Sequence, residues 1–276
     1  MLKKYLQWHS NTFLKYCENR LPYFSDKFFV RAFNIFLRIK NNRSRMSFNS
    51  QKNYFCIEEG NLSQTFRNKS QATHSYSNGL VNRGYQIADS YMLNEINFRP
   101  NDTVVDIGAN VGDLYLYFKH SNTKISYIGI EPGENEFICL KNNINGSCIN
   151  AAVSDKNGIQ NFYINEDGAD SSLIEPLIFT ETREIRTVTL DSMNFKQKIK
   201  LIKIEAEGSE PEILRGAIET LKVSEYVSAD LGPERGVLQE STYEEFIELM
   251  FKNGFDLKKI NPERLIILFK NRSYVK

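Results

Sequence analysis

A regular alternation of strand-like and helix-like segments over residues 103–269 constrains the fold of this chain more than any other feature. Short apolar runs bounded by turn residues predict strands, and amphipathic segments between them predict helices. The predicted strands are 103–107, 124–130, 148–153, 200–205, 225–230, 255–259 and 265–269, and the predicted helices are 111–119, 134–142, 211–221 and 243–253. Such alternation is typical of an α/β fold in which right-handed crossovers build a mostly parallel sheet.

The remaining segments are arranged around this alternating core. A further helix is predicted over 86–94, and the insert after the third strand alternates over 160–164 and 185–189 as two extra strands would. Residues 46–81 are rich in Asn, Ser and Gln, which indicates a linker with one short hairpin. We therefore predict three parts, namely an arm (1–45), a linker (46–81) and a main domain (82–276).

The N-terminal arm is basic and amphipathic. Apolar residues recur at helical spacing over 2–17 and again over 29–37. Against only Glu18 and Asp26, the arm holds ten basic residues: Lys3, Lys4, Lys15, Arg20, Lys27, Arg31, Arg38, Lys40, Arg43 and Arg45. Two interpretations follow. The arm packs on the main domain as a helical extension, or it docks to an anionic membrane surface or a lipid-linked substrate.

Cysteine spacing and hydropathy bear on the cell compartment. Cys17, Cys56, Cys139 and Cys148 lack the spacing of a metal site, so we expect reduced thiols and no metal. No segment approaches the ~18 apolar residues of a membrane span, and the N-terminus lacks the apolar core of a signal peptide. We expect a cytoplasmic protein, peripheral to the inner face of the membrane if the arm docks there. Nucleic acid is not an expected partner, because the main domain lacks a basic face.

The turn after the first predicted strand carries the first functional signal. It reads DIGANVG, from Asp106 to Gly112, where a dinucleotide-binding fold would have G-x-G-x-x-G. Ligands of open parallel sheets bind beyond the carboxyl ends of the strands. A carboxylate at that place repels a pyrophosphate and attracts a cation. S-adenosylmethionine is such a cation, since its sulfonium and amino group are positive and it has no phosphate.

A second acid strengthens this interpretation. Glu131 ends the second predicted strand, 25 positions after Asp106, close to where nucleotide-binding folds place the acid that binds ribose hydroxyls. A glycine turn alone would be weak evidence, because glycine there often serves conformation only. The two acids together predict S-adenosylmethionine as the cofactor.

The fourth parallel strand also ends in acids. Glu205 and Glu207 precede Gly208, and a helix follows. Two carboxylates at a buried strand end are costly unless they have a function. The alternative is structural, with Glu207 and Glu210 acting as ordinary negative charges at a helix N-terminus.

With these residues in place, the sequence resembles the FkbM family of S-adenosylmethionine-dependent methyltransferases. The segments that carry the resemblance are VVDIGANVG (104–112), GIEPGENEF (129–137), AAVSDKNG (151–158), TLDS (189–192) and IKIEAEGSEPEILRGA (202–217). The resemblance runs from about residue 83 to the C-terminus and does not include the arm.

The resemblance implies a Rossmann-like, seven-stranded class I methyltransferase sheet whose last strand is antiparallel, here with an N-terminal helical extension. It implies O-methylation of a hydroxyl on a sugar, a glycan or a secondary metabolite. It also implies a set of cofactor-binding residues: Asp106, Gly108, Asn110 and Gly112 on the methionine side, Glu131 at the ribose, and Asn150 and Ala151 near the adenine. The family usually has Asp at the position of Glu205.

Methyl transfer from a sulfonium needs alignment of donor and acceptor and removal of the hydroxyl proton. We take Glu205, Glu207 and Asp230 as the catalytic candidates, and we expect Glu207 to matter more than Glu205. Polar groups beside the pocket predict binding of a hydroxyl-rich acceptor; these are Glu210, Glu234 and Arg235. For Glu234 and Arg235 the alternative is a salt bridge within the loop. His74 is either a base folded over the site or a solvated loop histidine.

Two other functions compete with methyl transfer. A nicotinamide-dependent oxidoreductase could share a related fold, although the three-glycine fingerprint is absent. A non-catalytic module could be tethered to a membrane by the arm, although Asp106, Gly108, Gly112 and Glu131 are intact.

Overall fold

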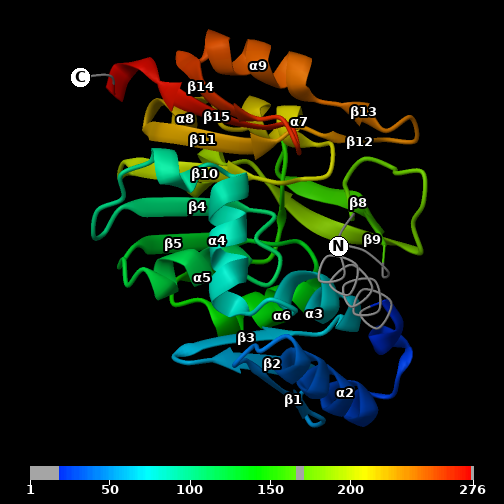
Figure 1. Cartoon of the computed structure of the whole chain (residues 1–276). Helices are drawn as coiled ribbons and strands as arrows, with labels where there is room; N and C mark the ends of the chain where they lie inside the picture. The colour runs from blue at the N-terminus through cyan, green and yellow to red at the C-terminus, as the bar shows by residue number, and fades with distance from the viewer. Residues whose placement is uncertain (1–18, 166–170, 275–276) are drawn as a thin grey trace, which may run out of the picture.

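The computed structural model describes residues 19–165 and 171–274. Its centre is a seven-stranded sheet of order β14-β15-β11-β10-β4-β5-β6, with helices on both faces (Figure 1). The strands are β4 (Thr103–Ile107), β5 (Ser126–Ile130), β6 (Ser147–Ile149), β10 (Ile199–Ile204), β11 (Ser224–Asp230), β14 (Phe255–Asn261) and β15 (Ile266–Asn271). β15 pairs antiparallel with both neighbours, whereas β6, β5, β4, β10 and β11 are parallel. The predicted α/β sheet with its antiparallel last strand is confirmed.

Apolar side chains from alternate positions of these strands face two different layers of helices. One face packs against α4 (Leu80–Ser90) and α5 (Asp113–His120), and the other packs against α7 (Glu210–Arg215), α8 (Ile218–Lys222) and α9 (Tyr243–Lys252). Every residue of β4 and of β11 is buried. In β4 the adjacent Val104 and Val105 belong to different hydrophobic clusters, as expected for a strand that is buried on both faces.

Three predicted elements have different boundaries in the structure. The predicted helix 211–221 is two helices, α7 and α8, and the predicted helix 86–94 begins earlier, at Leu80. The predicted strand 148–153 is divided at Asn150, whose side-chain amide donates to the carbonyls of Glu131 and Pro132. After this break, β7 (Ala152–Val153) leaves the main sheet and pairs with β9.

The two extra strands predicted in the insert are present. They are β8 (Gly158–Ile164) and β9 (Glu181–Val188), which pair antiparallel and form a second sheet with β7. This hairpin projects past the carboxyl ends of the parallel strands (Figure 1), where it can wall a ligand site.

The linker predicted at 46–81 is wrong, because this segment is folded. It contains an antiparallel sheet and a helix: β1 (Arg45–Asn49), β2 (Tyr54–Glu59), β3 (Leu62–Phe66) and α3 (Lys69–Tyr76). The segment is rich in polar residues, but the apolar side chains between them are buried, including Phe55, Ile57 and Phe66. Only one hairpin was expected, and the structure has two.

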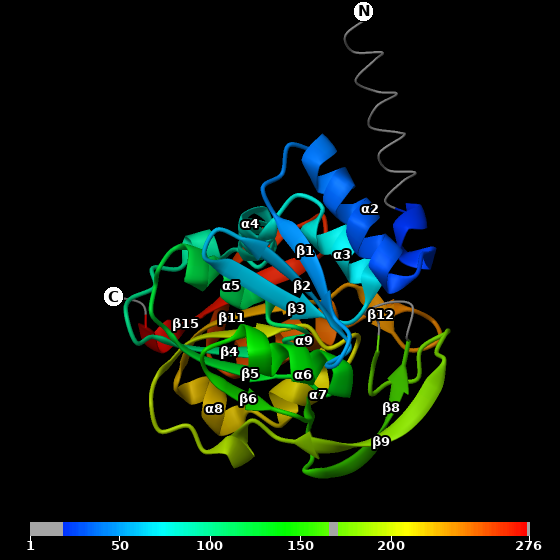
Figure 2. The same ribbon diagram turned by 90° about the horizontal axis from the view of Figure 1, so that it is seen from below.

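The helix α2 (Asp26–Ile39) covers this small sheet (Figure 2). Phe29, Phe33 and Leu37 of α2 are fully buried and share a hydrophobic cluster with residues of β1 to β3 and with Val111 and Leu116 near and in α5. The described part of the arm is therefore packed on the protein. The predicted helix over 2–17 lies outside the described residues. None of the helices within residues 19–165 and 171–274 has the length and apolar character to cross a membrane.

Candidate active site

A cavity of about 670 Å³ lies at the carboxyl ends of β4, β5 and β10. Its volume falls within the roughly 300 to 1,000 Å³ of small-molecule sites. The turns after these strands form its floor, α3 lines one wall, and residues of β8 and β9 line another. The site therefore combines the parallel sheet with two segments outside it, and α3 belongs to the stretch that the sequence indicated as a linker.

The glycine turn after β4 packs directly on the end of β10. Gly108 has a φ of 66°, and a Cβ there would lie 1.9 Å from the carbonyl oxygen of Glu205. Only glycine fits both the left-handed backbone and this close contact. Asn110, also left-handed with a φ of 48°, uses its backbone N–H to donate to Glu131 Oε2 at 2.8 Å. The glycine turn thus links the ends of three neighbouring strands.

Glu131 is buried beside this turn. Its Oε1 accepts from the N–H of Gly133 at 2.8 Å, as Oε2 does from Asn110. Burial raises the pKa of Glu131 to about 8, against the effect of these two backbone donors. A carboxylate oxygen can accept more than one hydrogen bond, so both oxygens retain capacity for ligand hydroxyls. This arrangement fits the predicted ribose-binding role.

Of the two residues predicted near the adenine, Asn150 and Ala151, one lines the cavity. Ala151 is buried and lines the cavity, whereas Asn150 does not line it. Asn150 instead fixes the chain after β5 through the two carbonyls it binds.

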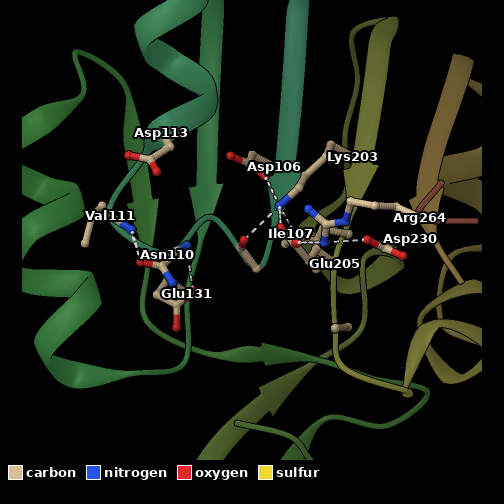
Figure 3. Close-up of polar contacts among 12 residues, drawn as sticks. Asp106, Ile107, Asn110, Val111, Asp113, Glu131, Lys203, Glu205, Asp230 and Arg264 are labelled. Carbon is tan, nitrogen blue, oxygen red and sulfur yellow. Dashed lines mark hydrogen bonds and ion pairs between the residues drawn. The ribbon is translucent and has the colours of Figure 1, made fainter. Parts of the chain in front are cut away.

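A chain of alternating charges crosses the floor of the cavity (Figure 3). Lys203, on β10, lies 3.1 Å from Asp106 Oδ1 and 2.9 Å from Glu205 Oε2. Arg264, between β14 and β15, lies 3.3 Å from Glu205 Oε1 and 2.7 Å from Asp230 Oδ2. The strand ends that the sequence marked as acidic are therefore bridged by two cations that it did not single out.

The charges of this chain set the chemistry of Glu205. Burial opposes its ionisation, but Lys203 and Arg264 outweigh burial and hold the pKa of Glu205 at about 2. For Asp230, burial has the larger effect and raises its pKa despite the contact with Arg264. A carboxylate that is ion-paired on both oxygens is a poor proton acceptor near neutral pH. The geometry thus argues against Glu205 as a general base.

Glu207 lies at the other end of the same loop and also lines the cavity. Its φ of 49° is unusual for a residue that is neither Gly nor Asn. Ser172 Oγ donates to its carbonyl at 2.7 Å, which holds this backbone in place. The Glu207 side chain forms a hydrogen bond with Glu234. Burial, together with the neighbouring carboxylates of Asp230, Glu210 and Glu205, raises the pKa of Glu234 to about 7.

The three residues predicted to bind the acceptor do not line the cavity. Glu210 is buried and accepts from the N–H groups of Ala206 and Gly208 and from the hydroxyl of Thr242, so it holds the loop after β10. Arg235 forms two hydrogen bonds with Glu212, at 2.9 and 3.0 Å. Both side chains are thus engaged by protein groups away from the cavity lining. Glu234 touches the site through Glu207.

His74 lies on a helix, α3, where a loop was expected, and it lines the cavity. Its Nδ1 is 2.9 Å from the carbonyl of Ser70. Because a carbonyl only accepts, Nδ1 carries the hydrogen in this bond. Gln71, one turn away, donates to Asn110 at 3.1 Å, so α3 contacts the glycine turn directly.

These features together define a class of protein. The strand order, the antiparallel β15, the glycine turn after an acid and the second acid at the end of β5 are those of a class I methyltransferase that binds S-adenosylmethionine. The three acids on the cavity floor outnumber the two cations that pair with them, so the floor suits a cationic cofactor that lacks phosphate. This result favours methyl transfer over the nicotinamide-dependent alternative.

The comparisons with known proteins agree with this class. The family model described as "Methyltransferase FkbM domain" matches residues 106–257, which is more than half of the chain. The chain belongs to the FkbM methyltransferase family, and S-adenosylmethionine is its cofactor. The resemblance seen in the sequence is confirmed. No curated protein matched the sequence.

Several solved methyltransferases are similar in structure at low sequence identity. A precorrin-6y C5,15-methyltransferase from Geobacter metallireducens has a TM-score of 0.41 and 12% identity, covering 67% of this chain and 87% of that chain. A TehB-like methyltransferase from Corynebacterium glutamicum has a TM-score of 0.39 and 9% identity, covering 67% and 88%. The M. capricolum TrmK structure, in complex with S-adenosylhomocysteine, has a TM-score of 0.40 and 9% identity, covering 68% of both chains.

Proposed function

We propose that this methyltransferase acts on a hydroxyl oxygen of a polar acceptor, such as a sugar unit of a glycan or a secondary metabolite. The observation that carries the proposal is the pair of carboxyl groups formed by Glu207 and Glu234, which share a hydrogen bond at the cavity. A hydroxyl is a weak nucleophile that must lose its proton during methyl transfer, so a base is needed. S-adenosylmethionine, when bound, supplies the electrophilic methyl group.

In this proposal Glu207 accepts the hydroxyl proton. Glu207 lines the cavity, where a carboxylate can take up the proton of an acceptor hydroxyl. Glu205 is better suited to a positioning role, since Lys203 and Arg264 hold it ionised. Asp230 then fixes Arg264, and acts on the acceptor only through it.

Substitution of Glu207 tests this assignment. Glu207→Gln should lower the rate of methyl transfer by roughly 10²- to 10⁴-fold, as expected for loss of a general base, and leave S-adenosylhomocysteine affinity unchanged. Glu184→Gln, at an exposed position of β9, is the matched control and should behave as wild type. Full turnover by Glu207→Gln at saturating acceptor would remove Glu207 from the mechanism.

The acceptor class can be tested without knowing the molecule. The protein is incubated with methyl-labelled S-adenosylmethionine and cell extract separated into glycan, lipid and small-molecule fractions, with protein and RNA fractions included. We expect label in the glycan or small-molecule fraction, bound through oxygen and stable to mild base. Label confined to protein or RNA would contradict the proposed acceptor.

We further propose a cytoplasmic protein that contacts the inner face of the membrane through its N-terminal region. The support is an outward face of the short helix η1 (Leu21–Tyr23) and of α2 with exposed apolar side chains, flanked by Lys27, Arg31 and Arg38. The exposed apolar residues are Tyr23, Phe24, Phe28, Ile35 and Ile39. An apolar strip beside cations suits the interface of an anionic bilayer.

Vesicle sedimentation tests this contact. The full chain should bind phosphatidylglycerol vesicles more strongly than phosphatidylcholine vesicles, and a Phe28→Glu, Ile35→Glu variant should lose most of that binding. Ile159→Glu, at a similarly exposed apolar position on β8, is the control. Equal binding by the α2 variant and wild type would reject the contact.

A further inference from the structure

The cofactor's amino-acid end carries an ammonium and a carboxylate, and the carboxylate needs a positive partner. Among the described residues, the basic side chains that line the cavity are Arg67, Arg83, Arg183, Lys203 and Arg264, with His74. Lys203 and Arg264 are each bound to two carboxylates. The candidate partners for the cofactor's carboxylate are therefore the other three arginines, Arg67, Arg83 and Arg183.

Two of these arginines are poorly suited. Arg183 holds its guanidinium against Glu181 through two hydrogen bonds, at 2.6 and 2.7 Å. Arg67 donates to Asn135, which follows Glu131 and so belongs to the ribose end of the site.

Arg83 has the required place and free donors. It projects from α4, and its Nε donates to Asp113 Oδ2 at 2.7 Å, in the first turn of α5 directly after the glycine turn. Its two Nη groups form no hydrogen bond to any residue that the structure describes. A guanidinium held by Nε alone can present its Nη pair to a carboxylate.

The surroundings fix Arg83 in this position. Asp113 Oδ1 also accepts from Gln64 at 3.0 Å and from the Tyr76 hydroxyl at 2.7 Å, so its carboxylate has three donors. The helices α4 and α5 touch at Gly84, where a Cβ would lie 2.9 Å from the backbone nitrogen of Tyr117. Burial works against the positive charge, but Asp113 outweighs burial and holds the pKa of Arg83 above its ordinary value.

We propose that the two Nη groups of Arg83 bind the α-carboxylate of S-adenosylmethionine. The opposite charges then divide the cofactor's amino-acid end between two sides of the site. The ammonium faces the acids at the ends of β4 and β10, and the carboxylate faces α4. Arg83 is thus a cofactor-binding residue, and Gln64, Tyr76 and Asp113 are the positioning residues behind it.

Calorimetry with a ligand that lacks only the carboxylate tests the proposal. Wild type should bind decarboxylated S-adenosylmethionine roughly 10- to 100-fold more weakly than S-adenosylmethionine, which is the range for charged hydrogen bonds. Arg83→Gln should lose a similar factor for S-adenosylmethionine and change its affinity for the decarboxylated ligand by less than about threefold. Arg83→Lys keeps the positive charge but lacks the paired donors of the guanidinium, so its affinity for S-adenosylmethionine should lie between those of wild type and Arg83→Gln.

Arg99→Gln is the matched control, because Arg99 is exposed and does not line the cavity. Its ratio of affinities for the two ligands should equal that of wild type. An Arg83→Gln variant that weakens both ligands equally would show a structural role and overturn the proposal. Equal affinity of wild type for both ligands would overturn it as well, and that measurement needs no variant.

Discussion

A single lysine organises the floor of this site. Lys203 is almost completely buried, contacts Asp106 and Glu205, and also donates to the carbonyl of Gly108 at 2.9 Å. Burying three charges is costly, and their mutual attraction offsets that cost only when the geometry is good. Burial lowers and the two acids raise the pKa of Lys203, with a net rise. Lys203 therefore stays charged and holds the glycine turn to β10.

Removing this charge should leave the buried Asp106 without its cation and Glu205 with Arg264 alone. Lys203→Met should lower the free energy of unfolding by about 3 to 5 kcal/mol, the range for breaking a buried ion pair. Lys198→Met, at a half-exposed lysine that pairs with Glu225, should cost under about 1 kcal/mol. Urea denaturation measures the free energy of unfolding of both variants. Equal losses in the two would contradict the assignment of Lys203 to a buried ion-pair network.

Cofactor affinity should depend on pH through Glu131. In the free protein this carboxyl is protonated below its raised pKa of about 8. Ribose hydroxyls donate best to the ionised form, so binding releases a proton. Affinity for S-adenosylhomocysteine should therefore rise from pH 6 to about 8 and level off above. Calorimetry over this pH range measures the affinity. Glu131→Gln should bind S-adenosylhomocysteine weakly, with an affinity that does not change between pH 6 and 8. Affinity that falls as pH rises would contradict the assignment.

At the scale of elements, the parallel strands and their turns could be predicted because their pattern is local. Val, Ile and Leu mark β4 and β10, although two lysines interrupt β10, and the acids at the strand ends mark the site. The small N-terminal sheet could not be predicted, because its core comes from single apolar residues separated by polar ones and completed by α2 and α5. Lys203 and Arg83 were missed for a related reason. Their roles depend on partners about 95 and 30 positions away in the chain.

The junction of the β4 turn with β10 provides a prediction for these elements. Gly108→Ala should abolish detectable cofactor binding and reduce stability by several kcal/mol, because its Cβ would collide with Glu205. Gly60→Ala is the matched control, with a φ of 61° against 66° and nothing within 4 Å of the added Cβ. It should cost about 1 to 2 kcal/mol. Thermal unfolding and calorimetry separate the two, and similar losses would mean that φ strain alone explains the turn.

At the scale of the whole molecule, hydrogen bonds join the N-terminal sheet (β1 to β3) to the glycine turn and to α6 beside the cofactor site. Gln64 of β3 donates to the carbonyl of Val111. Asn143, the last residue of α6 (Glu134–Asn143), bonds to both backbone groups of Thr65 and to the same Val111 carbonyl. The segment at 46–81 is therefore part of the support of the glycine turn.

Deleting residues 1–66 should consequently harm the site as well as the N-terminal sheet. The truncated chain would expose the apolar surface around Val111 and Leu116 and would lose the bonds from Gln64 and Thr65. We expect a lower unfolding temperature and at least a tenfold loss of S-adenosylhomocysteine affinity, or aggregation. A truncated protein that binds as the full chain does would show that the N-terminal sheet is accessory.

The central claim is that this site binds S-adenosylmethionine, a cationic nucleoside without phosphate, and that Glu131 holds its ribose. Calorimetry of the full chain with S-adenosylmethionine and with NAD, repeated on Glu131→Ala, tests it most directly. We predict clear binding of S-adenosylmethionine, none of NAD, and a loss of at least about 100-fold in the variant. Binding of NAD by wild type, or unchanged S-adenosylmethionine affinity in Glu131→Ala, would contradict it.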